Sequence, residues 1–356
     1  MNAYISAANK SIRIWGTFPP SDNYTNNIAT NVSVQHWELY EDNPYWDYIK
    51  NGYDVLNTDD AFYIVSKYST SYPQSINLTK VFHGSPDGGP YAPNIFDTNN
   101  ATNNPSRDEP RVLGHIAGLW NDYGPNTTVY SEAYYSWREG LPALADKQWG
   151  GQLVEEEYYA VFDRLHAAVP GQNLDRAIAS KSNTILSYSF NETDLPTVKD
   201  SSGNQYDGKT DCDVANGSLV LSSTCSLTTP LSSKGRDYTL SFSIYPTSDT
   251  PGALFSGPDS ALLAGNDTIS NITIVASGNP YILNYSLPLN TWTNASLVAR
   301  GNATFFKVDD PKEMQFLARI GLNGQSLVWR EVAIEAPLAT VGGGFEGLIR
   351  DIKLTT

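Results

Sequence analysis

Three tryptophans each end a short apolar run that could form a β-strand. Trp15 ends SIRIW, Trp37 ends VSVQHW and Trp120 ends GHIAGLW. In a β/α barrel the carboxyl ends of the strands form the functional face, and flat rings at that face could stack on the apolar side of a sugar. The pattern therefore predicts that the three indoles wall one carbohydrate pocket. The alternative is that each ring packs a loop onto the core.

The charge balance excludes nucleic acid as a partner. The formal net charge is −15, and no run of Lys and Arg is present to neutralise phosphates. An anionic membrane surface is excluded for the same reason, and no apolar run approaches the roughly 20 residues of a spanning helix. The 22 Tyr and 8 Trp suit a carbohydrate partner, although aromatic residues also fill cores.

Side chains for acid–base or metal chemistry are sparse. The one Asp-Glu pair, Asp108-Glu109, lies in SRDEPR without preceding glycines, and we interpret it as a solvated loop pair. The run Glu155–Glu157 begins a predicted helix, where carboxylates favour the positive end of the dipole. The histidines show no metal-ligand spacing, so no metal and no cofactor are expected; they are His36, His83, His115 and His166.

The compartment is indicated by glycosylation signals. The pattern N-x-S/T occurs far more often than chance predicts, which favours a glycosylated protein of the secretory pathway over a chain merely rich in Asn and Thr. The acceptors are Asn9, Asn23, Asn31, Asn77, Asn100, Asn126, Asn191, Asn216, Asn266, Asn271, Asn284, Asn294 and Asn302. Cys212 and Cys225 lie close together in a strand-rich region, as a hairpin disulfide would; two free core thiols are the alternative.

The amino terminus conflicts with this localisation. Met1–Ile5 (MNAYI) carries no basic start and no apolar stretch of a signal peptide. We therefore expect a secreted, extracellular protein of which this chain is a fragment, either by natural truncation or through an incomplete gene model.

Two halves with different periodicity follow one another. Residues 1–173 alternate short apolar strands with helical stretches, which predicts a parallel sheet or barrel. Residues 174–184 are small and polar and are predicted to be a linker. Residues 185–356 show short alternating runs separated by turn residues, which predicts an antiparallel β-sandwich.

The first half resembles the closing part of the barrel of family 20 glycoside hydrolases, the β-N-acetylhexosaminidases. The resemblance rests on the two early strand-ending tryptophans, then NTDDAFYIV, then GLWNDYG before a helix. It implies strands five to eight of a (β/α)8 TIM-type barrel. It implies that Trp15 and Trp37 enclose the acetamido group, that Tyr63 steadies the acetamido oxygen, that Trp120 lies under the sugar ring, and that Asp122 binds peripheral hydroxyls.

The resemblance also implies what this chain lacks. Val65 stands where the family has a hydroxyl-binding aspartate, and Asp122 is shorter than the usual glutamate, as in the lacto-N-biosidases, which release a disaccharide. The family uses substrate assistance with an Asp-Glu pair after a His-x-Gly-Gly signature, which does not occur here. The implied protein is a secreted glycosidase for terminal β-linked N-acetylhexosamine. The catalytic pair would lie upstream, with the missing amino-terminal half of the barrel as partner, so this chain alone should be inactive.

The second half resembles the laminin-G or concanavalin-like jelly roll, through SYSFNET, RDYTLSFSIYP and FEGLIRDIKL. Such sandwiches bind glycans, sometimes with calcium, or brace a neighbouring domain. A lectin-like protein without catalysis is therefore the competing hypothesis.

Overall fold

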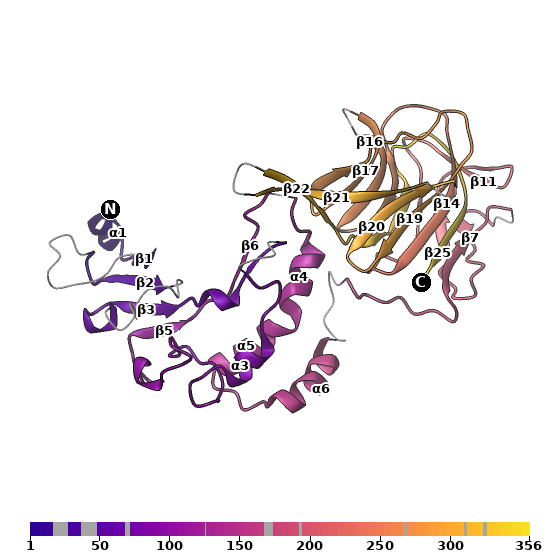
Figure 1. Cartoon of the computed structure of the whole chain (residues 1–356). Coiled ribbons are helices and arrows are strands. Elements are labelled where there is room, and N and C mark those ends of the chain that lie inside the picture. Colours follow the sequence, from indigo (N-terminus) through magenta and orange to yellow (C-terminus); the bar gives the residue numbers. More distant parts are fainter. Residues whose placement is uncertain are drawn as a thin grey trace. The chain divides into compact units, whose positions relative to one another are not determined.

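The computed structural model describes ten stretches of the chain: residues 1–16, 28–36, 48–67, 72–124, 126–166, 174–191, 194–266, 269–309, 312–322 and 326–356. They form two compact units (Figure 1). The first unit is Met1–Trp120 with Ser136–Pro170, and the second is Asn121–Tyr135 with Gly171–Thr356. Residues 121–135 thus belong with the carboxyl-terminal part of the chain, although residues 136–170 return to the first unit.

The first unit contains two small parallel sheets. The larger has the strand order β1-β2-β3-β5, and the smaller pairs β4 with β6. The strands are β1 (Ile12–Trp15), β2 (Val32–His36), β3 (Asp54–Asn57), β4 (Tyr63–Val65), β5 (Val112–His115) and β6 (Gly118–Trp120). The chain therefore moves from β3 to β4 and from β5 to β6 within a few residues, changing sheet each time.

Short helices accompany these sheets, and apolar side chains of α3, α5 and α6 form a core with the β4 strand. Phe62, Ile64, Phe82, Leu144 and Tyr158 belong to one buried cluster. The helical elements are α1 (Asn2–Ala7), α3 (Leu78–His83), α4 (Tyr130–Arg138), α5 (Gly140–Gln148) and α6 (Glu155–His166), with 3-10 turns η1 (Asp60–Phe62) and η2 (Ala101–Asn103).

The predicted half of a (β/α)8 barrel is wrong. In such a barrel each strand is followed by a helix, and successive strands join one closing sheet. Here β4 and β6 leave the four-stranded sheet, and the described chain between β3 and β5 supplies only the six-residue α3 and two 3-10 turns. Strands dominate the chain as a whole. Strand–helix alternation in the sequence identified several elements but not the sheet that each strand joins.

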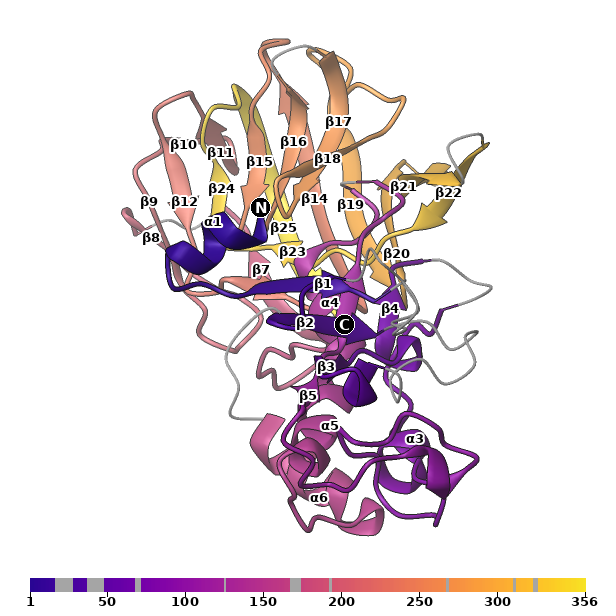
Figure 2. The same cartoon turned by 90° about the vertical axis from the view of Figure 1, so that its left-hand side faces the viewer.

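The second unit is a β-sandwich of two antiparallel sheets. One sheet has the order β10-β11-β25-β14-β19-β20-β21-β22, with β7 also paired to β25, and the other has the order β18-β17-β16-β15-β24-β12-β9-β8. Strands β15, β16 and β17 lie side by side in Figure 2. The first sheet contains β7 (Thr184–Tyr188), β10 (Val214–Ala215), β11 (Ser218–Leu221), β14 (Tyr238–Pro246), β19 (Thr293–Arg300), β20 (Ala303–Val308), β21 (Lys312–Leu322), β22 (Ser326–Glu331) and β25 (Gly347–Thr355). The second contains β8 (Thr197–Val198), β9 (Gly208–Thr210), β12 (Ser226–Thr228), β15 (Ala253–Ser256), β16 (Ser260–Asn266), β17 (Ile269–Ala276), β18 (Asn279–Ile282) and β24 (Thr340–Gly342), and a further pair joins β13 (Ser233–Lys234) to β23 (Ala336–Pro337).

Alternating side chains hold the two sheets together. On β14, Tyr238, Leu240, Phe242 and Ile244 are all at most 2% exposed and belong to one core cluster with residues of both sheets. This period of two is what a strand with one buried face requires. The narrower resemblance to a laminin-G or concanavalin-like domain remains a prediction.

Residues 121–135 form a segment, called the strap below, that packs onto the sandwich. Val129 is 2% exposed and belongs to the sandwich core. The Glu132 carboxylate accepts a hydrogen bond from the Ala333 amide at 2.9 Å, and Tyr281 donates to the Asn126 carbonyl at 2.9 Å. The strap is therefore a structural part of the sandwich.

Residues 174–184, predicted as a linker, also contact the sandwich. Leu174 is 1% exposed, Arg176 pairs with the buried Glu335 carboxylate at 3.3 Å, and the Ala179 carbonyl accepts a hydrogen bond from Tyr206. Residues 174–184 are therefore an extended segment that packs against the sandwich. Their polar composition is compatible with this because the backbone and Arg176 form hydrogen bonds and an ion pair with sandwich residues.

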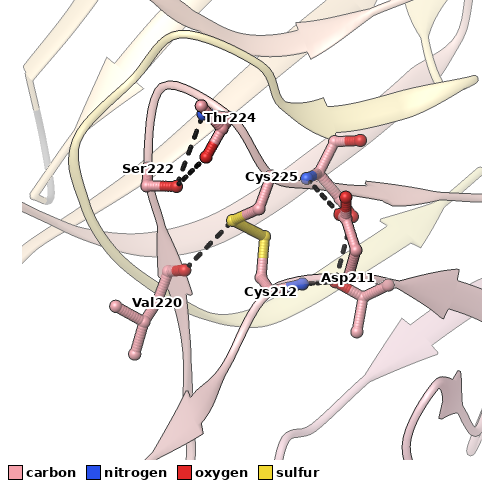
Figure 3. Close-up of a disulfide and its surroundings, with 8 residues drawn as sticks. Asp211, Cys212, Val220, Ser222, Thr224 and Cys225 are labelled. Atoms are coloured by element: carbon pink, nitrogen blue, oxygen red, sulfur yellow. Dashed lines mark hydrogen bonds between the residues drawn. A yellow bond between two sulfur atoms is a disulfide. The ribbon is translucent and has the colours of Figure 1, made fainter.

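The predicted disulfide is present between Cys212 and Cys225 (Figure 3). Cys212 follows β9, and Cys225 immediately precedes β12, to which β9 pairs. The Ser226 amide donates to the Asp211 carboxylate at 2.8 Å beside the bridge. The bridge therefore fastens the ends of two neighbouring strands near the edge of the second sheet.

Candidate functional site

Three of the predicted rings meet in the first unit. The ring centroids of Trp15 and Trp120 are 5.9 Å apart, those of Tyr63 and Trp120 are 6.0 Å apart, and those of Trp15 and Tyr63 are 6.4 Å apart. These distances are typical of aromatic pairs in direct contact. Trp15, Tyr63 and Trp120 therefore form one group, called the aromatic triangle below.

The smaller parallel sheet sets the geometry of the triangle. In the β4–β6 register Tyr63 lies opposite Gly118, and Val65 lies opposite Trp120. A Cβ atom on Gly118 would lie 2.7 Å from the Trp120 Nε1 atom and 3.3 Å from the Tyr63 Cδ1 atom. The missing side chain of Gly118 therefore allows the Trp120 indole to lie back over the strand, beside the Tyr63 ring.

The triangle has an open side and a buried side. Trp15 is 42% exposed and Trp120 is 39% exposed, whereas Tyr63 is 3% exposed. Exposed indoles beside a buried phenol offer a flat apolar surface with a polar group at its base. Such a surface can contact the apolar side of a small polar ligand.

The Tyr63 hydroxyl is buried, and among the described residues it has no hydrogen-bond partner. Burial raises the pKa of the phenol to about 12; the nearby Thr58 hydroxyl lowers it, and the Asp60 and Asp59 carboxylates raise it further. The Thr58 proton is donated to the His36 carbonyl, and the Thr58 and Tyr63 oxygens do not reach hydrogen-bond geometry. Tyr63 is thus a protonated donor at neutral pH with no acceptor.

A buried polar network holds the turn that leads into Tyr63. The Asp59 Oδ2 atom accepts hydrogen bonds from Lys80 Nζ at 2.7 Å and from the Tyr91 hydroxyl at 3.0 Å. Its Oδ1 atom accepts from the Ala61 amide at 2.9 Å, which caps η1. Asn57 donates to the Ile95 carbonyl at 2.6 Å and so fixes the end of β3. These contacts position Tyr63 without touching its hydroxyl.

Asp60 is a second carboxylate near the triangle that the motif-based predictions missed. It is half-buried in η1, and burial together with the Asp59 charge raises its pKa, while Lys80 lowers it. The pair of aspartates in NTDD, directly before FYIV, was the available signal. The sequence did not show which aspartate pairs with Lys80, because Lys80 is distant along the chain.

Three further sequence predictions concern Trp37, Asp122 and Val65. Trp37 lies outside the described residues. Asp122 is exposed and belongs to the second unit, so its predicted contact with sugar hydroxyls stays a prediction. Val65 is 4% exposed and packs in the interior.

The Asp108-Glu109 pair and the acidic start of α6 have structural roles. Asp108 is exposed, with its pKa lowered by the Ser106 hydroxyl, and the Glu109 carboxylate accepts from the Arg111 amide at 3.2 Å. This is the predicted solvated loop pair. Glu155 begins α6, as predicted, and lies 2.8 Å from His83 Nε2.

The described ranges contain neither a metal-ligand cluster nor a membrane-spanning helix. Among those residues, no three or more His, Cys, Asp or Glu side chains gather closely enough to hold a metal ion. No helix in the same part of the chain is both long and apolar enough to cross a membrane.

Comparisons with known proteins give distant likenesses only. No protein-family model and no curated protein match the chain. Among solved structures, the chain is similar to domain 4 of AbnA, a GH43 extracellular arabinanase from Geobacillus stearothermophilus in complex with arabinotriose. The identity is 19% and the TM-score 0.33, covering 49% of this chain and 92% of that one.

Two other solved structures have the same TM-score to this chain. Trypanosoma rangeli sialidase in complex with sialic acid has 10% identity and a TM-score of 0.33, covering 52% of this chain and 32% of the sialidase. The receptor-binding domain of botulinum neurotoxin mosaic serotype C/D has 14% identity and a TM-score of 0.33, covering 49% of this chain and 47% of that one. The chain thus spans about a third of the sialidase, and TM-scores this low support no argument about fold or activity.

Proposed function

We propose that the chain binds a carbohydrate at the aromatic triangle and serves a glycoside hydrolase. The observation that carries the proposal is the buried Tyr63 hydroxyl, which has no partner and lies beside two exposed indoles. A buried donor without an acceptor is unfavourable by about 1–3 kcal/mol. A ligand that supplies an acceptor for the Tyr63 hydroxyl removes this cost, and the relief favours binding. The Trp15 and Trp120 rings would contact the apolar surface of the ligand.

The sugar that fits best is a terminal β-linked N-acetylhexosamine. Its acetamido group offers a carbonyl oxygen for the Tyr63 hydroxyl and a methyl group for the surrounding rings. The resemblance to family 20 glycoside hydrolases assigns these roles to Tyr63 and Trp15, with the sugar ring over Trp120. The shorter Asp122 is the feature that favours release of a disaccharide, as in lacto-N-biosidases.

In the whole enzyme, the acetamido oxygen would attack the anomeric carbon and displace the leaving oxygen, and water would then open the cyclic intermediate, so that two inversions give overall retention of configuration. Tyr63 would donate to this oxygen and hold it in position, while the indoles exclude water from the reacting face. The glutamic acid that protonates the leaving oxygen, and its aspartate partner, would come from a segment upstream of this chain. Such a chain binds sugar but does not hydrolyse it alone.

A second candidate is lectin-like binding by the sandwich. Trp329 on β22 is 57% exposed and lies opposite Arg319 of β21, with Leu327 exposed two residues earlier on the same face. An exposed indole on a regular strand beside a guanidinium also suits a sugar ring and its hydroxyls. This candidate needs no catalysis.

Calorimetric titration of the full chain with an oligosaccharide ending in β-linked N-acetylglucosamine separates the two candidates. The triangle predicts saturable binding that Trp120→Ala weakens at least tenfold and that Trp329→Ala leaves unchanged. Loss of binding in Trp329→Ala alone assigns the sugar to the sandwich instead. A chromogenic N-acetylglucosaminide should show no turnover by this chain, and robust hydrolysis would contradict the upstream placement of the acid.

A further inference from the structure

An aromatic group lies on the outer face of the first sandwich sheet, where β25, β14 and β19 are neighbours (Figure 1). Side chains of β14 alternate between the core and this outer face, and Tyr245 faces outwards and is half-buried. The half-buried Trp292 directly precedes β19, and its ring centroid lies 5.5 Å from that of Tyr245. Arg350 of β25 places its guanidinium carbon 4.1 Å from the Trp292 ring centroid. An outward-facing apolar group of this kind is typical of an interaction surface.

Asn294 shares this face with the aromatic group. It lies two residues after Trp292 and is exposed. Its Oδ1 atom accepts a hydrogen bond from the hydroxyl of Ser243, its cross-strand neighbour on β14, at 2.8 Å. The carboxamide therefore has a fixed orientation in which Oδ1 is engaged, and Nδ2 points away from Ser243. A group attached at Nδ2 leaves the Ser243 hydrogen bond intact.

Asn294 is also the acceptor of an N-x-S/T pattern, in which Ser296 supplies the hydroxyl. Among the acceptors in the sequence, Asn294 alone has an aromatic residue two positions before it. Alternate residues of a strand lie on one face, about 7 Å apart, so the first sugar of a glycan at Asn294 lies within reach of Trp292. The indole can contact the apolar side of this sugar, and the Arg350 guanidinium can donate to its hydroxyls.

We propose that Asn294 carries an N-linked glycan whose first N-acetylglucosamine packs on Trp292 and covers this outer face. In the transfer, Nδ2 gives a proton to a base of the transferring enzyme and forms a C–N bond to C1 of the sugar. The bond from C1 to the diphosphate of a lipid-linked donor breaks, and the diphosphate leaves with its lipid. The sugar–indole contact exists only in the folded state, so the glycan stabilises the sandwich. This role is independent of sugar binding at the aromatic triangle.

Secretion of the full chain from a eukaryotic host, directed by an added leader peptide, tests the modification. Treatment with peptide N-glycosidase in ¹⁸O-labelled water converts each glycosylated asparagine to labelled aspartate, which mass spectrometry of the peptides detects. We expect the label at Asn294 in most molecules. An unlabelled Asn294 in the secreted protein overturns the proposal.

Urea unfolding of the secreted protein tests the packing. Ser296→Ala removes the glycan but keeps Asn294 and its bond to Ser243, and it should raise the unfolding equilibrium constant about threefold to tenfold. In a Trp292→Ala background the effect of Ser296→Ala should fall below about twofold. Ser11→Ala, which removes the acceptor signal of the exposed Asn9, is the matched control and should change nothing. Bacterially produced, unglycosylated wild type and Ser296→Ala should be equally stable.

Endoglycosidase trimming keeps the test decisive should Trp292→Ala fail to fold. Trimming leaves one N-acetylglucosamine on each occupied site, and the difference in stability between wild type and Ser296→Ala should persist, because the first sugar makes the contact. A difference that trimming abolishes, that Ser11→Ala reproduces, that Trp292→Ala leaves unchanged or that the bacterial proteins also show overturns the proposed packing.

Discussion

At the scale of single residues, Tyr63 combines a structural cost with a proposed binding role. Because its hydroxyl is buried without a partner, Tyr63→Phe should stabilise the free chain by about 1 kcal/mol. The same substitution should weaken binding of an N-acetylhexosamine ligand about tenfold, since it removes the proposed hydrogen bond. Urea unfolding measures the first effect and calorimetric titration the second.

Tyr4→Phe is the matched control, since Tyr4 is 83% exposed and neither quantity should change. A Tyr63→Phe variant that is destabilised and binds sugar normally would show that the hydroxyl serves the fold.

His115 is a residue-scale source of acid sensitivity in the first unit. Burial lowers its pKa to about 4, the Asp59 charge opposes this and the Lys80 charge adds to it. The unfolded histidine, with a pKa near 6.5, therefore binds protons that the folded one does not. Stability is full above pH 6.5 and falls as pH drops towards 4, by roughly 1.4 kcal/mol per unit of pKa difference.

Urea unfolding between pH 7 and pH 4 measures this dependence. His115→Gln should flatten the curve in this window, and His83→Gln, which removes a half-exposed histidine, should not flatten it as much. An equal effect of both substitutions would show that His115 is not the group responsible.

At the scale of elements, Gly118 decides whether the triangle can form. A methyl group there would meet the Trp120 indole and the Tyr63 ring, so Gly118→Ala should displace Trp120 and weaken sugar binding about tenfold or more. Gly321→Ala is the matched control, because a Cβ atom at Gly321 meets nothing within 4 Å. Near-ultraviolet circular dichroism, which reports the packing of aromatic rings, and calorimetric titration measure the two effects. Unchanged binding in Gly118→Ala would exclude the triangle as the sugar contact.

Element-scale patterns predicted much of the sandwich and less of the first unit. RDYTLSFSIYP is one of the segments on which the expected sandwich rested, and β14 spans Tyr238–Pro246 within it. The apolar run before Trp15 predicted β1. The run before Trp120 predicted one strand over Val112–Trp120, whereas the structure divides it into β5 and β6, which join different sheets. The Trp15 and Trp120 rings at the ends of β1 and β6 lie together. β4 pairs with β6, and β1 and β5 are the edge strands of the four-stranded sheet. Both features depend on contacts between distant segments, which local periodicity does not predict.

The strap shows the same limit at the scale of the whole molecule. Residues 121–135 precede the expected sandwich by about fifty residues in the sequence, yet Val129 is part of its core. The Glu132 carboxylate accepts one hydrogen bond from the Val129 amide of the strap and another from the Ala333 amide of the sandwich. The sequence around Glu132 looks like that of any helix start. The hydrogen bond from the Ala333 amide joins residues that are distant along the chain, so no local pattern predicts it.

Removing the Glu132 contact should destabilise the sandwich. We expect Glu132→Ala to lower the free energy of unfolding by about 1–3 kcal/mol, because the Ala333 amide loses its acceptor. Glu157→Ala, an exposed residue of α6, should change it by less than about 0.5 kcal/mol. Urea unfolding followed by far-ultraviolet circular dichroism, to which the strands of the sandwich contribute, measures the difference. Equal stability of the two variants would mean that the strap is dispensable.

The account as a whole depends on the aromatic triangle being the sugar site, and nuclear magnetic resonance of the tryptophan indole N–H groups tests this directly. The full chain, labelled with ¹⁵N at tryptophan and assigned through Trp15→Phe, Trp120→Phe, Trp149→Phe and Trp329→Phe, is titrated with an oligosaccharide ending in β-linked N-acetylglucosamine. We predict that the Trp15 and Trp120 signals shift together and saturate at one concentration, while the Trp329 and Trp149 signals stay in place. Movement of Trp329 alone, or of no indole at all, would contradict the account.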